Sequence, residues 1–298
     1  MRSKSSSSGS SGHRSKLARA FKLAGGIRLN PRKLKRGLIF AGAGMAMARI
    51  GLGFWRLKQR PARKQAMRGQ NVIITGASSG IGKALAQELA KAGCNLVLAA
   101  RRTELLQALA AELEKDYGIE TLVVPTDVSE EVQARTLIDK ALARFGQIDV
   151  LINNAGVATY SYFYKDDLAG MRRVMEVNYW GAVYCTRAVL PDMMGHRSGM
   201  IVNVSSVGGK MGQPGIGNYC ATKHALNGLS ESLRIELAKY GIHVLLVCPT
   251  STRTDIVMSA SNNSAFALDK QNYFGMSAER VARETLTSML DRKREHVL

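Results

Sequence analysis

The sequence Asn71-Val-Ile-Ile-Thr-Gly-Ala-Ser-Ser-Gly-Ile-Gly82, followed by residues 83–92, decides the fold of this 298-residue chain. Its first five residues are mostly apolar and predict a short buried strand, whereas residues 83–92 place alanine and leucine at helical spacing. Between these segments lie Gly76, Gly80 and Gly82, which allow a tight turn and a close approach of the backbone to a phosphate. The N-terminus of the helix adds amide donors. Strand, glycine turn and helix in this order predict the phosphate-binding unit of a dinucleotide fold.

Further strands are predicted along the chain. The strand 95–100 ends at Arg101, where an acidic residue would bind a ribose 2′-hydroxyl and an arginine accommodates a 2′-phosphate. Arg101 therefore indicates NADP(H), unless it only precedes the helix predicted for 103–115. Segments 122–128 and 150–156 continue the alternation of strand and helix. We predict an α/β fold with a doubly wound parallel sheet, in three layers, and a ligand at its carboxyl edge.

Tyr219 and Lys223 lie four residues apart at the start of a segment, 219–240, with helical spacing of its leucines. Both side chains would share one helix face. An ammonium group beside a phenol favours the phenolate, so Tyr219 could act as an acid and base near neutral pH. Ser206 follows the apolar run 200–204 and would lie beside Tyr219 if that run is the neighbouring strand. As an isolated pair, Tyr219 and Lys223 would be an ordinary exposed pair.

Together these motifs resemble the short-chain dehydrogenase/reductase family over about residues 71–254. The resemblance is carried by Thr75-Gly76-xxx-Gly80-x-Gly82, Asp127-Val128, Asn153-Asn154-Ala155-Gly156, Asn178, Ser206 and Tyr219-xxx-Lys223. It implies a single Rossmann-type domain that transfers a hydride between NADP(H) and a carbonyl or secondary alcohol. The implied cofactor-binding residues are Gly76, Ser78, Gly80, Ile81, Gly82, Arg101, Asp127, Val128, Asn154, Ala155, Gly156, Tyr219, Lys223, Pro249 and Thr254.

The resemblance also implies the catalytic roles. Tyr219 would be the acid and base, and Ser206 would orient the substrate oxygen. Lys223 would bind the ribose hydroxyls and tune Tyr219, while Asn178 would hold a water in the proton relay. The sequence departs from the family after Pro249, because Thr250 stands where a glycine is usual. We expect a different backbone angle in this loop.

The substrate is expected to be apolar. Residues 255–276 would form the lid and are rich in apolar side chains, which suits an apolar or lipid-like ketone. These side chains could equally serve only to pack the lid onto the core. A non-catalytic NADPH-binding scaffold or sensor is the alternative function, although a scaffold has no need for all four catalytic residues.

The positive charge is concentrated at the N-terminus. The formal net charge is +19, but residues 1–70 hold 18 Lys and Arg and no acidic residue, whereas the rest is nearly neutral. We predict a disordered basic arm over 1–36, an apolar segment over 37–57 and a basic linker over 58–70, before the reductase domain 71–298. The segment 37–57 could span a bilayer or lie on its surface as an interfacial helix.

This layout resembles membrane-anchored lipid-ketone reductases, with the catalytic domain facing a reducing, cytosol-like compartment. The arm could instead be a cleaved peptide that targets an organelle, or a solvated arm. It lacks the interleaved aromatic residues typical of nucleic-acid binding, so no nucleic-acid partner is expected. Four cysteines without metal-ligand spacing predict small buried residues and no metal site. Assembly of identical subunits follows from the resemblance alone.

Overall fold

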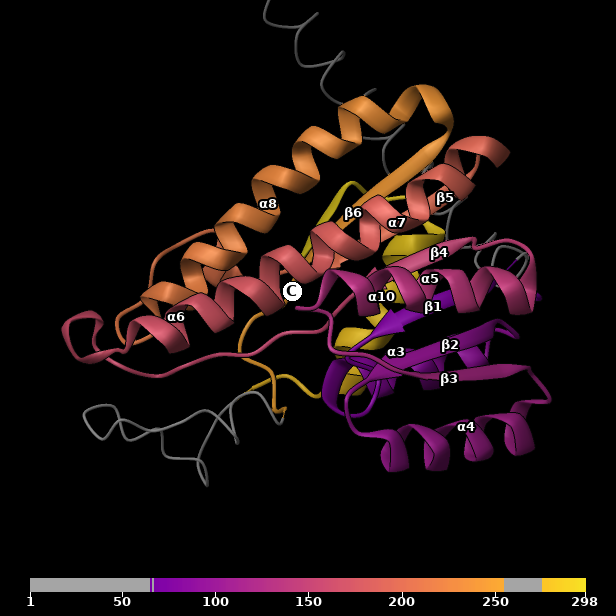
Figure 1. Cartoon of the computed structure of the whole chain (residues 1–298), viewed down its shortest axis with the longest axis horizontal. Helices are drawn as coiled ribbons and strands as arrows, with labels where there is room; N and C mark the ends of the chain where they lie inside the picture. The colour runs from indigo at the N-terminus through magenta and orange to yellow at the C-terminus, as the bar shows by residue number, and fades with distance from the viewer. Residues whose placement is uncertain (1–64, 66, 255–274) are drawn as a thin grey trace, which may run out of the picture. The chain divides into compact units, whose positions relative to one another are not determined.

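A parallel sheet forms the centre of the computed structural model, which describes residues 65, 67–254 and 275–298, all within the unit Lys58–Leu298. In these residues seven strands pair in the order β3-β2-β1-β4-β5-β6-β7 (Figure 1). The strands are β1 (Asn71–Thr75), β2 (Asn95–Ala100), β3 (Thr121–Pro125), β4 (Val150–Asn153), β5 (Gly199–Val204), β6 (Ile242–Cys248) and β7 (Glu295–Val297). The strand order reverses between β1 and β4, which is where parallel sheets of this kind bind ligands, at their carboxyl edge.

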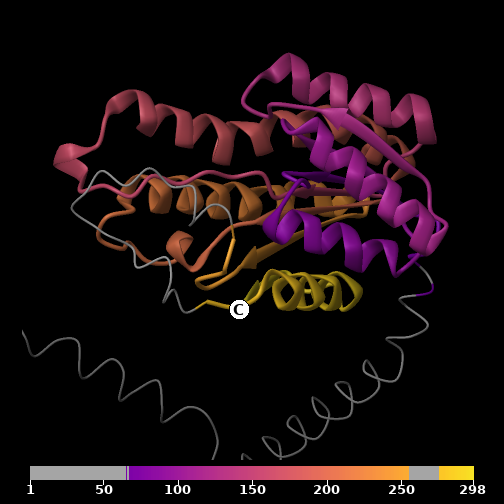
Figure 2. The same ribbon diagram turned by 90° about the horizontal axis from the view of Figure 1, so that it is seen from below.

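Helices cover both faces of the sheet. The α-helices are α3 (Gly80–Ala90), α4 (Thr103–Tyr117), α5 (Glu131–Phe145), α6 (Leu168–Met175), α7 (Gly181–His196), α8 (Gly217–Leu237) and α10 (Ala278–Leu290). A π-helix, η2 (Glu176–Trp180), joins α6 to α7, and single 3₁₀ turns are η1 (Phe163–Lys165), η3 (Val207–Gly209) and η4 (Ala238–Tyr240). Figure 2 shows α10, in yellow, on the opposite side of the sheet from α7.

Alternating side chains of the strands build two cores. Val72 and Ile74 of β1 pack with α3, α4 and α10, whereas Ile73 between them packs with α5, α7 and α8. All three side chains are fully buried. Because neighbouring residues of a strand point to opposite faces, a strand buried on both faces is a continuous apolar run. This explains why the sequence of β1 has no polar residue between its ends.

The predicted fold is confirmed, with one element missed. The doubly wound, three-layer arrangement is present, and the four cysteines are free and buried as expected. The strand β7 was not predicted; residues 292–294 lead into it, and the Arg294 carbonyl accepts a hydrogen bond from the Leu246 amide. The sequence Glu295-His-Val297 is too short and too polar to signal a strand.

Several predictions fall outside the described residues: the arm 1–36, the apolar segment 37–57, most of the linker 58–70, and the lid over 255–274. Within the described part of the chain, none of the helices has the length and apolar character needed to cross a bilayer. The C-terminal end of the linker is described. There Met67 is buried against the core, and the Gly69 amide donates to the Gly93 carbonyl.

Candidate active site

The glycine turn between β1 and α3 is shaped so that only glycine fits. Gly76 and Gly80 have φ values of +68° and +54°, which side-chain-bearing residues rarely adopt. A Cβ atom on Gly82 would lie 2.2 Å from the Gly76 carbonyl oxygen, which is backbone and cannot rotate away. Glycine at positions 76, 80 and 82 thus lets the backbone of the turn fold closely against the N-terminus of α3. This arrangement fits a phosphate group, because helix N-termini present free amides and partial positive charge.

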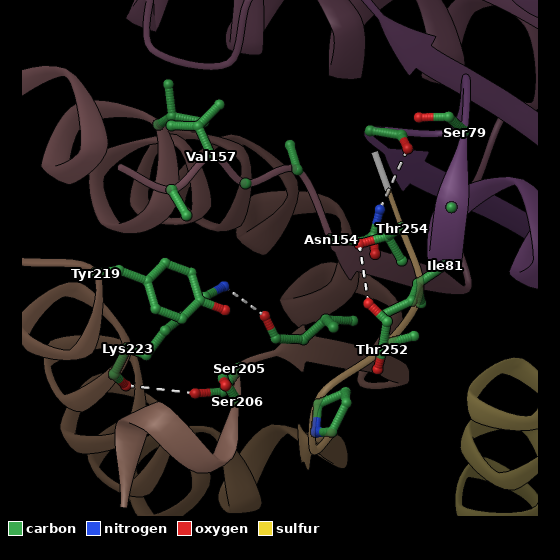
Figure 3. Close-up of a pocket in the computed structure, with 18 of the residues that line it drawn as sticks. Ser79, Ile81, Asn154, Val157, Ser205, Ser206, Tyr219, Lys223, Thr252 and Thr254 are labelled. Carbon is green, nitrogen blue, oxygen red and sulfur yellow. Dashed lines mark hydrogen bonds between the residues drawn. The ribbon is translucent and has the colours of Figure 1, made fainter. Parts of the chain in front are cut away.

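A cavity of about 860 Å³ opens from this turn along the carboxyl ends of the strands. Its volume lies within the range of roughly 300–1,000 Å³ that is usual for ligand sites. Every predicted catalytic and cofactor-binding residue lines it except Gly82 and Asn178. In Figure 3, Tyr219, Lys223, Ser205 and Ser206 lie together on one side, and Ser79 and Ile81 lie on the other. The sequence motifs therefore meet in one place.

Arginines crowd one end of the cavity. Arg102 donates to the Oγ atoms of Ser78 and Ser79 at 3.0 and 2.7 Å. Arg101 is 65% exposed, with its Nη1 3.9 Å from Asp127 Oδ2. Arg173 of α6 pairs with the same Asp127 oxygen at 2.7 Å. Two of these guanidinium groups thus pair with one carboxylate, and all three line the cavity, an arrangement that suits an anionic group.

Asp127 is held in its charged form. Burial raises the pKa of its carboxyl group, but hydrogen bonds from Ser129 and Arg173 outweigh this effect, and the pKa lies below its ordinary value. Its position just after β3 matches the prediction from the sequence, and it lines the cavity beside Val128. At this end the carboxylate orients Arg101 and Arg173.

Asn154 ties the end of β4 to the glycine turn. Its side-chain amide donates to the carbonyls of Thr75 and Gly76 at 2.9 and 3.3 Å. In return, the backbone amides of Asn154 and Ala155 donate to Thr75 Oγ1. Because Thr75 is buried, this exchange satisfies polar groups that water does not reach. It fixes residues 154–156, which line the cavity, beside the turn.

Ser206 and Tyr219 lie next to each other. Ser206 follows β5 and accepts a hydrogen bond from the Gly208 amide at 3.0 Å. A Cβ on Gly208 would lie 3.4 Å from both Ser206 Oγ and Tyr219 Cε1, so both side chains flank the same point. The strand next to α8 therefore places Ser206 as expected. Two side chains that carry hydroxyl groups thus meet at one point of the cavity, and preplaced hydroxyl donors can stabilise negative charge that develops on a carbonyl oxygen.

Lys223 lies beneath the tyrosine and is only 4% exposed. Its Nζ donates to the Val204 carbonyl at 2.9 Å and is 5.6 Å from the centroid of the Tyr219 ring. Burial lowers the pKa of this ammonium group to about 8. Tyr219 and Lys223 are thus not the exposed pair that their spacing alone would suggest, because water cannot screen the charge there.

Asn178 lies behind the cavity wall, in the π-helix. Its Oδ1 accepts from the Val157 amide at 2.8 Å, and its Nδ2 donates to the Val157 carbonyl and to Thr222 Oγ1. A Cβ on Gly156 would lie 3.3 Å from Asn178 Oδ1 and 3.8 Å from Lys223 Nζ. Gly156 thus lies between the side chains of Asn178 and Lys223. The side chain of Asn178 fixes the loop after β4, and its predicted role with a water stays a prediction.

The loop after β6 reaches across to the glycine turn. The side chain of Thr254 lies against Gly80, where a Cβ would be 3.2 Å away. Among the described residues, the non-glycine residues with positive φ are Arg197 and Arg292, so Thr250 has an ordinary backbone conformation. Threonine therefore replaces the usual glycine without backbone strain. The Thr250 amide donates to the Leu298 carbonyl at 3.1 Å.

Sequence reasoning missed two arginines that line the cavity. Arg102 directly follows Arg101, so its place at the strand end could have been recognised. Arg173 lies in α6, 46 residues after Asp127 in the sequence, and no local sequence pattern indicates their contact. No cluster of metal-ligating side chains occurs among the described residues.

The chain is similar to known proteins over most of its length. The family model for short chain dehydrogenase matches residues 70–265. A Dehydrogenase/reductase SDR family protein 7-like protein of Drosophila melanogaster is 35% identical over 245 residues, which cover 80% of this chain and 75% of the relative.

Two solved structures are similar throughout the fold. A short-chain dehydrogenase from Sphingobium yanoikuyae in complex with NADPH is 32% identical with a TM-score of 0.70, over 76% of this chain and 87% of that chain. A short chain dehydrogenase/reductase from Burkholderia phymatum in complex with NAD is 31% identical with a TM-score of 0.70, over 78% of this chain and 89% of that chain. With its glycine turn, its cavity and these matches, the chain belongs to the short-chain dehydrogenase/reductase family of NAD(P)(H)-binding oxidoreductases.

Proposed function

We propose that this chain transfers a hydride between NADP(H) and an apolar, lipid-like ketone or the corresponding secondary alcohol. One observation carries the proposal: a single cavity has Ser206, Tyr219 and Lys223 at one side and the arginines 101, 102 and 173 at one end. The hydroxyl groups suit a reacting carbonyl, and the guanidinium groups suit the additional phosphate that distinguishes NADP(H) from NAD(H). The acidic residue that would favour a free ribose 2′-hydroxyl is replaced by Arg101.

The bound nicotinamide supplies the hydride, and the residues of the chain do the rest. Tyr219 donates a proton to the substrate oxygen in reduction and accepts it in oxidation. Ser206 donates a hydrogen bond that orients the same oxygen. Lys223, held by the Val204 carbonyl, favours the phenolate of Tyr219 and binds the ribose hydroxyls. Around the glycine turn, Ser78 and Ile81 line the phosphate end of the cavity.

The support for an apolar substrate comes from the sequence of the predicted lid and from one wall of the cavity. Val157, Ala158, Val207, Pro214 and Ile216 line this wall near the tyrosine. They offer few hydrogen bonds to a polar substrate, and burial of each substrate methylene group is worth about 0.8 kcal/mol. Activity should therefore rise with the length of an apolar chain on the ketone.

The test uses the full-length chain, its Tyr219→Phe variant and, as a matched control, Tyr240→Phe in η4, which is not among the residues that line the cavity. Each is incubated with NADPH and ketones graded by chain length, and NADPH absorbance is followed. We expect Tyr219→Phe to lower turnover by about 10²–10⁴-fold, the usual contribution of acid–base catalysis, with NADPH binding nearly unchanged. Tyr240→Phe should behave like the wild type.

Two other outcomes would contradict the proposal. If Tyr219→Phe keeps its turnover, Tyr219 is not the proton donor. If the wild type binds NADPH tightly but turns over none of the carbonyls or alcohols, the chain is instead a non-catalytic NADPH-binding scaffold or sensor.

A further inference from the structure

The last strand, β7, touches both loops that border the reacting end of the cavity. Glu295, its first residue, forms an ion pair with Lys210 at 2.8 Å, and Lys210 directly follows the turn that begins at Ser206. Directly after the strand, the Leu298 amide donates to the Cys248 carbonyl, and the Leu298 carbonyl accepts from the Thr250 amide. One strand is therefore bonded to the loop of Ser206 and to the loop of Pro249 and Thr250.

The two loops are also bonded to each other. The Val207 amide donates to the Pro249 carbonyl at 3.0 Å. Together with the two contacts of β7, this bond closes a ring: Ser206 turn to Pro249 loop, Pro249 loop to Leu298, and Glu295 back to Lys210. Because β7 pairs with β6 in register from Leu246 to Cys248, its own position is fixed by the sheet. A ring of this kind removes relative motion that any single contact would leave.

The Lys210–Glu295 pair is well formed although it lies near the surface. The two side chains are about one third exposed, at 35% and 34%. The hydrogen bond that Lys210 donates to Glu295 raises the pKa of its ammonium group above the ordinary value, so Lys210 stays charged through the neutral range. Within the turn, the amides of Lys210 and Met211 both donate to the carbonyl of Val207, the residue after Ser206. A displacement of Lys210 would therefore also displace Val207.

We propose that Glu295 is a positioning residue: through Lys210 it fixes the turn that carries Ser206 relative to the Pro249–Thr250 loop, which the same strand holds through Leu298. This inference rests on the proposed function for its catalytic consequence. Misplacement of Ser206 should affect the orientation of the substrate oxygen, because small displacements of positioning groups reduce rate. It should leave the phosphate end of the cavity intact.

The test is a charge-reversal cycle in the full-length chain: Glu295→Lys, Lys210→Glu and the double swap. Each single variant should lower kcat by about three- to fivefold, since an exposed ion pair contributes only modestly, and the swap should restore it to within about twofold. NADPH affinity should stay unchanged throughout. The matched control is Glu120→Lys, which breaks the exposed Arg144–Glu120 pair on the far edge of the sheet and should leave kcat unchanged.

Amide hydrogen exchange gives a readout that does not depend on turnover. The amides of Val207 and Thr250 should exchange faster in both single variants and regain protection in the swap. Restoration of protection without any measurable turnover would support the ring and refute the proposed function. Exchange and kcat that are unchanged in Glu295→Lys, or a swap no better than the singles, would overturn the inference.

Discussion

Lys223 offers a direct test of how the site is built, through the variant Lys223→Met. In the folded chain the pKa of this ammonium group falls from 10.5 to about 8 because it is buried. A difference of about 2.5 units corresponds to about 3 kcal/mol, at about 1.4 kcal/mol per unit. Below pH 8 the wild type holds a buried charge at this cost, and methionine at the same position would remove both the charge and its cost.

The sign of the pH dependence follows from where the proton is bound. Between about pH 8 and pH 10.5 the unfolded chain keeps the proton on Lys223 and the folded chain releases it, so the wild type becomes more stable as the pH rises. Lys223→Met has no such group. The unfolding free energy of the wild type minus that of Lys223→Met should therefore increase by about 2 kcal/mol between about pH 8 and pH 9.5. At pH 7 the variant should be at least as stable, since loss of the bond to Val204 offsets part of its gain.

The assay is urea unfolding of the cofactor-free, full-length proteins at several pH values. Lys91→Met is the matched control, because Lys91 is exposed and its hydrogen bond with Glu88 raises the pKa of its ammonium group. The difference in unfolding free energy between the wild type and Lys91→Met should not change over the same pH range. If the difference in unfolding free energy between the wild type and Lys223→Met is also independent of pH, Lys223 is not a buried ammonium group with a lowered pKa.

Two further substitutions test the cofactor end. Arg101→Asp should shift the preference from NADPH towards NADH, because it places a carboxylate where a ribose 2′-hydroxyl would bind; steady-state kinetics with both cofactors measures this, and an unchanged preference would remove Arg101 from that role. Gly82→Ala should lower NADPH affinity and cost about 1–3 kcal/mol in unfolding free energy, since its Cβ would overlap the Gly76 carbonyl. Gly228→Ala in α8, which has nothing within 4 Å of its Cβ, should instead be neutral or stabilising by up to about 1 kcal/mol; equal behaviour of the two alanines would contradict the close approach at the turn.

Much of the fold and of the site is local in the sequence and could be predicted from it. The strand, turn and helix of 71–90 follow from a continuous apolar run, three glycines and helical periodicity. Ser206, Tyr219 and Lys223 follow from one strand end and one helix start. Such features need only neighbouring residues to be recognised, and the sheet then brings their carboxyl ends to one edge.

What the sequence could not provide depends on contacts between distant segments. Arg173 reaches Asp127 across 46 residues, and the ion pair of Lys210 joins residues 85 apart, so neither has a local signature. The strand β7 exists because β6 offers it an open edge, and its own three residues carry no β pattern. Thr250, in place of the usual glycine, has no positive φ, and the expected difference in the backbone angle of this loop stays a prediction.

Burial of Lys223 is the property that separates this pair from an ordinary tyrosine and lysine four residues apart. Stability alone would not select for a buried ammonium group, because an apolar side chain of similar length would fill the same space without the cost of desolvation. The cost does have a consequence for the phenol. A charge fixed by the Val204 carbonyl and shielded from water acts on the tyrosine ring through a medium of low polarity, whereas an exposed lysine would be screened by solvent. Burial of Lys223 therefore both lowers its pKa and strengthens its effect on Tyr219. Groups with perturbed pKa values of this kind concentrate at functional sites.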